Sequence, residues 1–173
     1  EVVSVSSINI LNKLNNNGLI PILGTETIKA LEKEVFKSIE DTWSAMQRVG
    51  SKTTLEILND FSELKPSPEN FSVLVLCGKG KNGGDSLLTA DHVMRAIPRA
   101  YVSVILYSKR SELDPLTERA LASIESRATI HYLDGAFQEA LLREILEPLI
   151  SAPEGLNLCL DGLLGLGFIS PLK

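Results

Sequence analysis

The stretch VLVLCGKGKNGGDSLLTADHV, residues Val73–Val93, decides how this chain folds. It begins with an apolar run of strand length, continues through a segment with four glycines, and ends with apolar residues at helical spacing. A tight connection of this kind brings several backbone N–H groups to the start of a helix, where they attract an anion. The sequence therefore predicts a strand, an anion-binding loop over Gly78–Ser86 and a helix in direct succession.

The rest of the chain repeats the alternation of strand and helix. Further strand-like runs occupy 101–107, 128–133 and 156–161, and helical patterns occupy 86–97, a segment opened by Asp114 and Pro115, and 136–150. Near-continuous apolar strands that alternate with helices are typical of a parallel sheet with helices on both faces. We expect an α/β protein with a three-layer α/β/α, Rossmann-like architecture and a mostly parallel sheet.

The amino-terminal part has a different pattern. Residues 1–20 are polar and rich in turn formers, so we expect a lead-in there and one domain over 21–173. A helix is predicted from Thr25, with the threonine as its cap, and a second helix from about Asp41. The residues expected on the buried face of this second helix are Trp43, Met46, Gly50, Thr53, Ile57 and Phe61, with Gly50 allowing close backbone packing.

Composition narrows the class of protein. The chain has 173 residues, is 44% hydrophobic and carries a formal net charge of −5, which is typical of one globular domain and argues against nucleic-acid binding. Its sequence has no apolar run of transmembrane length, so we expect no membrane span. Cys77 and Cys159 are expected to be buried and reduced, which favours an intracellular protein, cytoplasmic or mitochondrial.

A second glycine-rich loop, DGLLGLGFISP (Asp161–Pro171), follows the fourth predicted strand. Ligands bind beyond the carboxyl ends of parallel strands, so both loops should face the same crevice. The carboxylate of Asp161 needs a partner, which a metal ion, a ligand amide or a loop N–H can supply. Asp85 in the first loop is equally compatible with capping a helix and with binding a ligand. Lys79 and Lys81 add positive charge there.

Two common nucleotide-binding motifs fit the first loop poorly. Gly78, Gly80 and Gly83 match G-x-G-x-x-G, but the acidic residue expected about 20 positions later is replaced by the basic segment YSKRSE. This argues against an ordinary dinucleotide-dependent oxidoreductase. A phosphate-binding loop of the nucleotide triphosphatases needs lysine and a hydroxyl where Gly84 and Asp85 stand.

The two loops together resemble the NAD(P)H-hydrate epimerase family, which is built on the YjeF N-terminal domain and includes the apolipoprotein A-I-binding protein. The family pattern runs roughly GPGNNGGDG, then D-A-[LI]-[LF]-G-T-G and a later [SR]-P. ILGTETIKALEKEVFKS and MQRVGSKTTLEIL are similar to the two opening helices of the family. The resemblance spans about Pro21 to Leu172.

The resemblance implies a function and a site. Members of the family interconvert the R and S forms of hydrated NADH and NADPH, commonly dimerise and bind a potassium ion. It implies a homodimer, a potassium ion held by Asn82 and Asp161, and Asp161 as the catalytic carboxylate. The substrate-binding residues that it implies are Lys81, Asn82, Gly83, Gly84, Asp85, Gly165, Leu166, Gly167, Phe168, Ile169, Ser170 and Pro171.

The sequence also departs from the family pattern. Lys81 stands in place of asparagine, Ser86 in place of glycine and Leu166 in place of threonine, and no D-I-P-S-G segment follows. We therefore expect a domain that is incomplete at its carboxyl end, and an alternative function as a catalytically inactive nucleotide-binding or scaffold domain. Lys81 can contact the substrate pyrophosphate, take the place of the cation, or simply face solvent.

Overall fold

The computed structural model describes residues 24–61, 71–133, 139–152 and 155–165. The predicted lead-in over 1–20 lies outside these residues. The chain divides into two compact units, with the boundary between Thr42 and Trp43. The first unit contains helix α2, Thr25–Val35, whose N-cap is Gly24 with an extended backbone. Thr25 is the first helical residue, so the prediction that it caps the helix is wrong.

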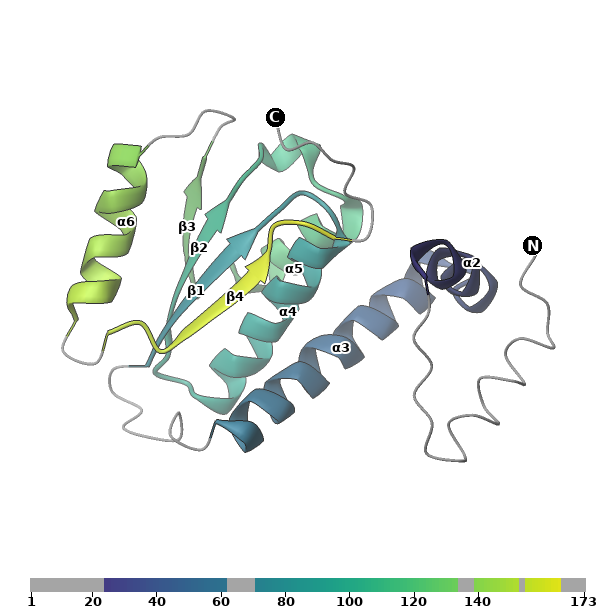
Figure 1. The fold of residues 1–173 in the computed structure, drawn as a ribbon, viewed down its shortest axis with the longest axis horizontal. Coiled ribbons are helices and arrows are strands. Elements are labelled where there is room, and N and C mark those ends of the chain that lie inside the picture. Colours follow the sequence, from purple (N-terminus) through teal and green to yellow (C-terminus); the bar gives the residue numbers. More distant parts are fainter. Residues whose placement is uncertain (1–23, 62–70, 134–138, 153–154, 166–173) are drawn as a thin grey trace. The chain divides into compact units, whose positions relative to one another are not determined.

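The second unit is built on a parallel sheet of four described strands (Figure 1). In chain order these are β1, Ser72–Cys77; β2, Tyr101–Leu106; β3, Thr129–Tyr132; and β4, Leu158–Gly162. Their order across the sheet is β3-β2-β1-β4. The most continuously apolar strand, β1, lies between two neighbours, because its side chains can be buried from both faces.

Helices cover both faces of this sheet (Figure 1). Helices α3, Ile39–Asp60, α4, Lys81–Ala96, and α5, Pro115–Ile124, lie on one side, and α6, Glu139–Ser151, lies on the other. Side chains alternate accordingly: Val73 and Val75 of β1 belong to the core beneath α4 and α5, whereas Leu74 packs with α6. The predicted three-layer α/β/α architecture is confirmed.

The predicted helix boundaries are confirmed in part. The carboxylate of Asp114 accepts a hydrogen bond from the Leu116 amide at 2.9 Å, and Pro115 is the first residue of α5. The helix predicted over 136–150 is described as α6 from Glu139 to Ser151, with Pro148 inside it. Leu149 is buried in the core between α6 and the sheet, which stabilises the turn that follows the proline. No helix among the described residues is long and apolar enough to cross a membrane.

Helices α3 and α4 pack backbone against backbone at Gly50. A Cβ atom at this position would lie 2.9 Å from the carbonyl carbon of Leu88 and 3.0 Å from the amide nitrogen of Thr89. One turn later the buried hydroxyl of Thr54 donates to the Thr89 carbonyl at 3.2 Å. Thr54, and not the predicted Thr53, belongs to the buried face, and the predicted Phe61 is 50% exposed.

Replacing Gly50 with alanine is expected to destabilise the fold by about 1–2 kcal/mol. The methyl group forces α3 away from the backbone of α4, and this strain exceeds the helix propensity that alanine gains. Urea unfolding measures the change. Thr53→Ala, an exposed substitution on the same helix, is the control and should change stability by less than about 0.5 kcal/mol. Equal stability of the two variants would contradict the close packing.

Candidate functional site

The loop after β1 is shorter than the sequence predicted. It covers only Gly78–Gly80, because α4 already begins at Lys81. Gly80 is the N-cap with an extended backbone, and its carbonyl accepts the Gly83 amide at 2.9 Å. Asp85 therefore lies in the second turn of the helix, so of the two roles considered for it, capping α4 is excluded. The amides of Lys81 and Asn82, the first two of α4, have no carbonyl partner within their own helix, so they can bind an anion.

Tight packing explains why a helix can begin through two glycines. A Cβ atom at Gly83 would collide with the Gly78 carbonyl and lie 2.9 Å from the Cys77 sulfur. A Cβ atom at Gly84 would lie 2.6 Å from the terminal methyl group of Met46. The intrinsic helix propensity of glycine is poor, and the close contacts with neighbouring elements outweigh it.

The second glycine loop packs against the first. The Gly78 amide donates to the Gly162 carbonyl at 3.1 Å. A Cβ atom at Gly78 would collide with the Leu163 carbonyl, and one at Gly162 would collide with the Ser86 hydroxyl and lie 2.9 Å from the Asn82 carbonyl oxygen. The two loops therefore converge at the carboxyl edge of the sheet.

Asn82 and Asp161 hold adjacent residues of the second loop. The side-chain amide of Asn82 donates to the Leu164 carbonyl at 2.7 Å, and Oδ1 of Asp161 accepts the Leu163 amide at 3.0 Å. Gly165 lies next to them, since a Cβ atom there would be 3.3 Å from Cβ of Asn82. Of the three partners considered for Asp161, the structure shows the loop N–H. Its side chain remains exposed to solvent.

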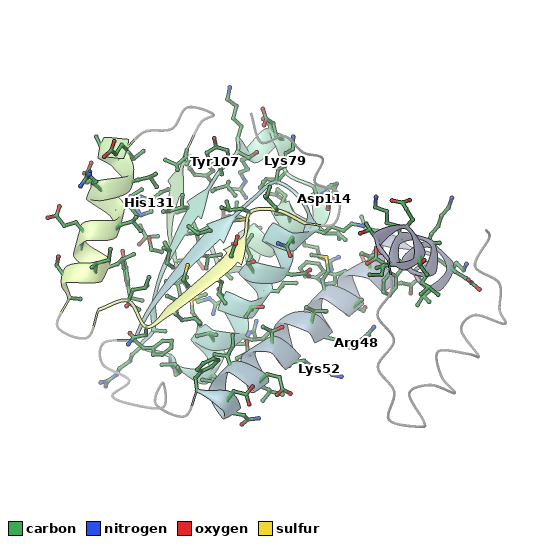
Figure 2. The ribbon with its side chains drawn as sticks, viewed as in Figure 1. Arg48, Lys52, Lys79, Tyr107, Asp114 and His131 are labelled. Atoms are coloured by element: carbon green, nitrogen blue, oxygen red, sulfur yellow. The ribbon has the colours of Figure 1, made fainter. Side chains whose placement is uncertain are left out.

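The amino-terminal end of α4 is open on one side. Lys79, Gly80 and Lys81 are exposed, and no described atom outside the immediate chain lies within 4 Å of a Cβ atom built at Gly80. Figure 2 shows Lys79 at the same edge of the protein as Tyr107 and Asp114. The space beside Gly80 gives a ligand access to the first amides of the helix.

The two cysteines differ in their surroundings. Cys77 is buried behind the first loop, and burial raises the pKa of its thiol to about 12, so it stays protonated. Cys159 is exposed, and the prediction that both cysteines are buried is wrong for this residue. It lies on β4, which with β3 is one of the two edge strands of the described sheet, and the side chains of an edge strand are covered from fewer directions.

Part of the predicted site lies outside the described residues. Among the described residues no group of three or more His, Cys, Asp or Glu side chains could hold a metal ion. Asn82 and Asp161 can supply side-chain oxygens, and carbonyl groups of the two loops can supply others. The predicted substrate-binding residues outside the described part of the chain are Leu166, Gly167, Phe168, Ile169, Ser170 and Pro171.

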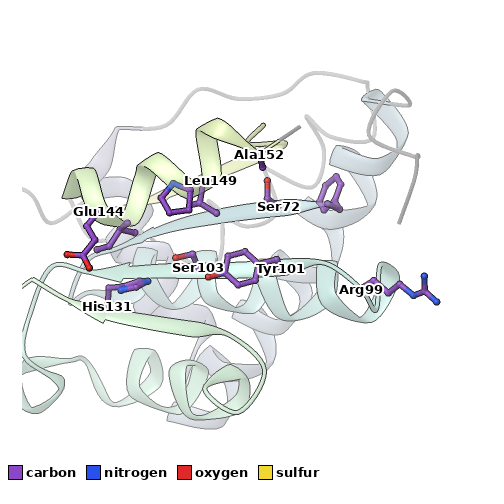
Figure 3. A pocket seen from close by; sticks show the side chains of 11 residues that line it. Ser72, Arg99, Tyr101, Ser103, His131, Glu144, Leu149 and Ala152 are labelled. Atoms are coloured by element: carbon purple, nitrogen blue, oxygen red, sulfur yellow. The ribbon is translucent and has the colours of Figure 1, made fainter. Parts of the chain in front are cut away.

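A pocket that the sequence did not predict lies between α6 and the sheet (Figure 3). Its volume is about 350 Å³, and its lining includes Tyr101 and Ser103 of β2, His131 of β3, and Glu144 and Leu149 of α6. In the sequence, Ser103 in the middle of an otherwise apolar strand is a feature that could have indicated this pocket. The pocket extends to Ser72 and Tyr101, where β1 and β2 begin, so it is separate from the glycine loops.

The sequence and the fold agree with one known family. Residues 43–173 match the family described as YjeF-related protein N-terminus. The chain belongs to this family. The match covers the whole second unit, including both glycine loops.

Two curated proteins to which the chain is similar have names that refer to NAD(P)H hydrate. The bifunctional NAD(P)H-hydrate repair enzyme Nnr of Salinibacter ruber is 29% identical over 88% of this chain and 28% of its own length. The NAD(P)H-hydrate epimerase of Fusarium vanettenii is 26% identical over 75% of this chain and 57% of its own.

A solved structure supports the fold. The crystal structure of yeast ynu0 has a TM-score of 0.67 and 19% identity, and the alignment covers 89% of this chain and 60% of that protein. This likeness concerns the fold alone. The present chain spans 28% and 57% of the length of the two curated relatives and 60% of the yeast protein.

The contact between the loops predicts opposite outcomes for two glycine variants. Gly162→Ala should lower the free energy of unfolding by about 1–3 kcal/mol, because the new methyl group meets Ser86 and the Asn82 backbone. Gly80→Ala, which projects into open space, should change it by less than about 0.5 kcal/mol. Thermal unfolding compares the two.

A double variant tests the cause. Ser86→Gly removes the hydroxyl that a residue 162 side chain would meet, so it should recover part of the stability lost in Gly162→Ala. The contact with the Asn82 carbonyl remains and limits the recovery. Strictly additive effects would show that Ser86 and Gly162 do not touch.

Proposed function

We propose that this chain carries an NAD(P)H-hydrate epimerase domain that interconverts the R and S forms of hydrated NADH and NADPH. The observation that carries the proposal is the 2.7 Å hydrogen bond from Asn82 to the Leu164 carbonyl. It joins the anion-binding end of α4 to the loop that bears the exposed carboxylate of Asp161. Membership of the family and the names of the two curated relatives support the same function.

The first loop suits the pyrophosphate of a dinucleotide. The amides at the start of α4 present a partial positive charge, and Lys79 and Lys81 are exposed beside them. Gly80 leaves room for a phosphate to approach the backbone. Gly83 and Gly84 have a structural role, because neighbouring atoms leave no room for a side chain at either position. Contact of their backbone with the substrate stays a prediction.

The second loop suits the reacting ring. Epimerisation of the hydrate breaks the ring carbon–oxygen bond as a proton reaches the departing hydroxyl group. This releases water and leaves a delocalised ring cation. Addition of water to the opposite face and loss of a proton complete a cycle that consumes nothing. A carboxylate at Asp161, held in place by the Leu163 amide, would stabilise the cation, because it is already oriented before the charge develops.

A potassium ion fits the donor atoms that the two loops offer. The side-chain nitrogen of Asn82 binds Leu164, which leaves Oδ1 of Asn82 as its oxygen donor. Asp161 and loop carbonyl groups add oxygen ligands of the type that hard cations prefer. A bound potassium ion would supply positive charge beside the phosphates. These two side chains alone do not complete a coordination shell, so backbone oxygens must contribute.

A catalytically inactive nucleotide-binding or scaffold domain is the second candidate. Ser86 favours it, because this residue fills the space that glycine leaves open in the family pattern. Its hydroxyl donates to the Asn82 carbonyl at 3.0 Å and lies against Gly162. A scaffold of this kind would bind the dinucleotide without accelerating exchange between its two forms.

The decisive experiment follows purified R-hydrate as it converts to the S form. Wild-type protein should accelerate the exchange above the rate in buffer, and Asp161→Asn should lower kcat about a hundredfold, because it removes the negative charge near the ring cation. Cys159→Ser, an exposed substitution on the same strand, is the matched control and should keep full activity. Exchange no faster than in buffer, with hydrate still bound, would favour the scaffold.

Lys81 gives a second test of the site. Lys81→Asn should raise KM about twofold to fivefold, since one exposed charge beside the pyrophosphate is lost, and the effect should shrink at high salt. Lys52→Asn, on the exposed side of α3, is the control. Assays with and without potassium separate the alternatives. A new requirement for potassium would place the ammonium at the cation position, and unchanged kinetics would leave Lys81 facing solvent.

A further inference from the structure

Thr117 is a fully buried polar residue of α5 whose side chain binds a different element. It is 0% exposed, and its hydroxyl donates to the Gly80 carbonyl at 2.9 Å, across 37 positions of sequence. Gly80 is the N-cap of α4, and no described residue lies within 4 Å of a Cβ atom built on it. The bond therefore holds the carboxyl-terminal end of the candidate anion-binding loop against α5.

Neighbouring groups hold the loop in the same way. The Asp114 amide, at the start of α5, donates to the Lys79 carbonyl at 2.8 Å. The Tyr107 amide, which follows β2, donates to the Cys77 carbonyl at 2.9 Å. Donors from outside the loop thus bind the carbonyl group of Cys77, at the end of β1, and those of Lys79 and Gly80 in the loop.

These bonds, together with the Gly83 amide that also donates to the Gly80 carbonyl at 2.9 Å, fix where the loop amides point. In a planar trans peptide, the carbonyl and the N–H of the next residue point in opposite directions. The Gly80 carbonyl points toward Thr117 on α5, so the Lys81 N–H of the same peptide points away from α5. In the preceding peptide the Lys79 carbonyl points toward the Asp114 amide, so the Gly80 N–H also points away from α5. The backbone of the loop is then ordered before any ligand binds.

We propose that Thr117 is a positioning residue that orients the Gly80–Lys81 peptide toward a bound phosphate. It acts through the backbone and does not touch the ligand. The identity of the phosphate compound as a hydrated dinucleotide rests on the proposed function, whereas the orientation of the peptide rests on the hydrogen bonds alone. Thr117 is fully buried, and valine has nearly the same shape, so the hydroxyl can be tested independently of the side-chain volume.

The test removes the hydroxyl and keeps the shape. Thr117→Val loses the donor, and Thr117→Ser retains it. Thr54→Val is the matched control, because Thr54 is also a buried threonine that donates to backbone carbonyls, but at the contact between α3 and α4. Inorganic pyrophosphate is titrated into each variant, and its affinity is read from the NMR shift of the Lys81 amide.

Thr117→Val should bind pyrophosphate about threefold to tenfold more weakly, the value of one hydrogen bond, and Thr117→Ser should bind as the wild type does. Thr54→Val should lose stability and keep its affinity. In the epimerase assay, Thr117→Val should raise KM and leave kcat unchanged, because the phosphate is bound equally in the ground and transition states.

Three results would overturn the proposal: equal affinity of the valine and serine variants, an equal loss of affinity in Thr54→Val, or no binding of pyrophosphate by the wild type. A wild type that binds pyrophosphate but does not epimerise the hydrate would contradict the proposed function. The role of Thr117 would still stand, since its first readout does not depend on catalysis.

Discussion

The site depends on the contact between two glycines at the ends of neighbouring strands. Gly78 follows β1 and donates its amide to the carbonyl of Gly162, the last residue of β4. Neither position has room for a side chain, because a Cβ atom would meet the backbone of the other loop or the first turns of α4. This backbone contact brings the start of α4 and the residues after Asp161 to one place.

The register of the sheet makes this contact possible. Cys77 pairs with Gly162, so β1 and β4 end at the same level. If β4 were shifted along β1 by two residues, the same side chains would stay buried, but the two loops would lie about 7 Å further apart. The central strand also pairs with β2, whose end supplies the Tyr107 amide to the Cys77 carbonyl. The loop is thus held by both neighbours of β1 and by α5.

The sequence predicted the order of strands and helices because each strand is a nearly continuous apolar run with a clear break on either side. It also predicted that the two glycine loops converge, because the carboxyl ends of parallel strands share one edge. It failed where long-range packing outweighs local propensity. Gly83 and Gly84 indicate a loop when read locally, but the backbone of Gly78 lies so close to Gly83, and Met46 and Thr117 so close to Gly84, that a helix without side chains packs best there. The exposure of Cys159 could not be predicted either, because it depends on the position of β4 at an edge of the described sheet, and the order of the strands along the chain does not reveal that position.

The glycines of the first segment therefore have two different functions, although they look alike in the sequence. Gly78, Gly83 and Gly84 face other parts of the protein and permit close packing, whereas no described residue lies within 4 Å of a Cβ atom built at Gly80. Packing alone does not require glycine at position 80, whose backbone is in an extended conformation that any residue adopts. The absence of a side chain at this one position leaves the amino-terminal end of α4 accessible, next to two exposed lysines. Packing against the described residues therefore explains three of the four glycines, and the proposed phosphate contact gives the fourth, Gly80, a role that packing does not.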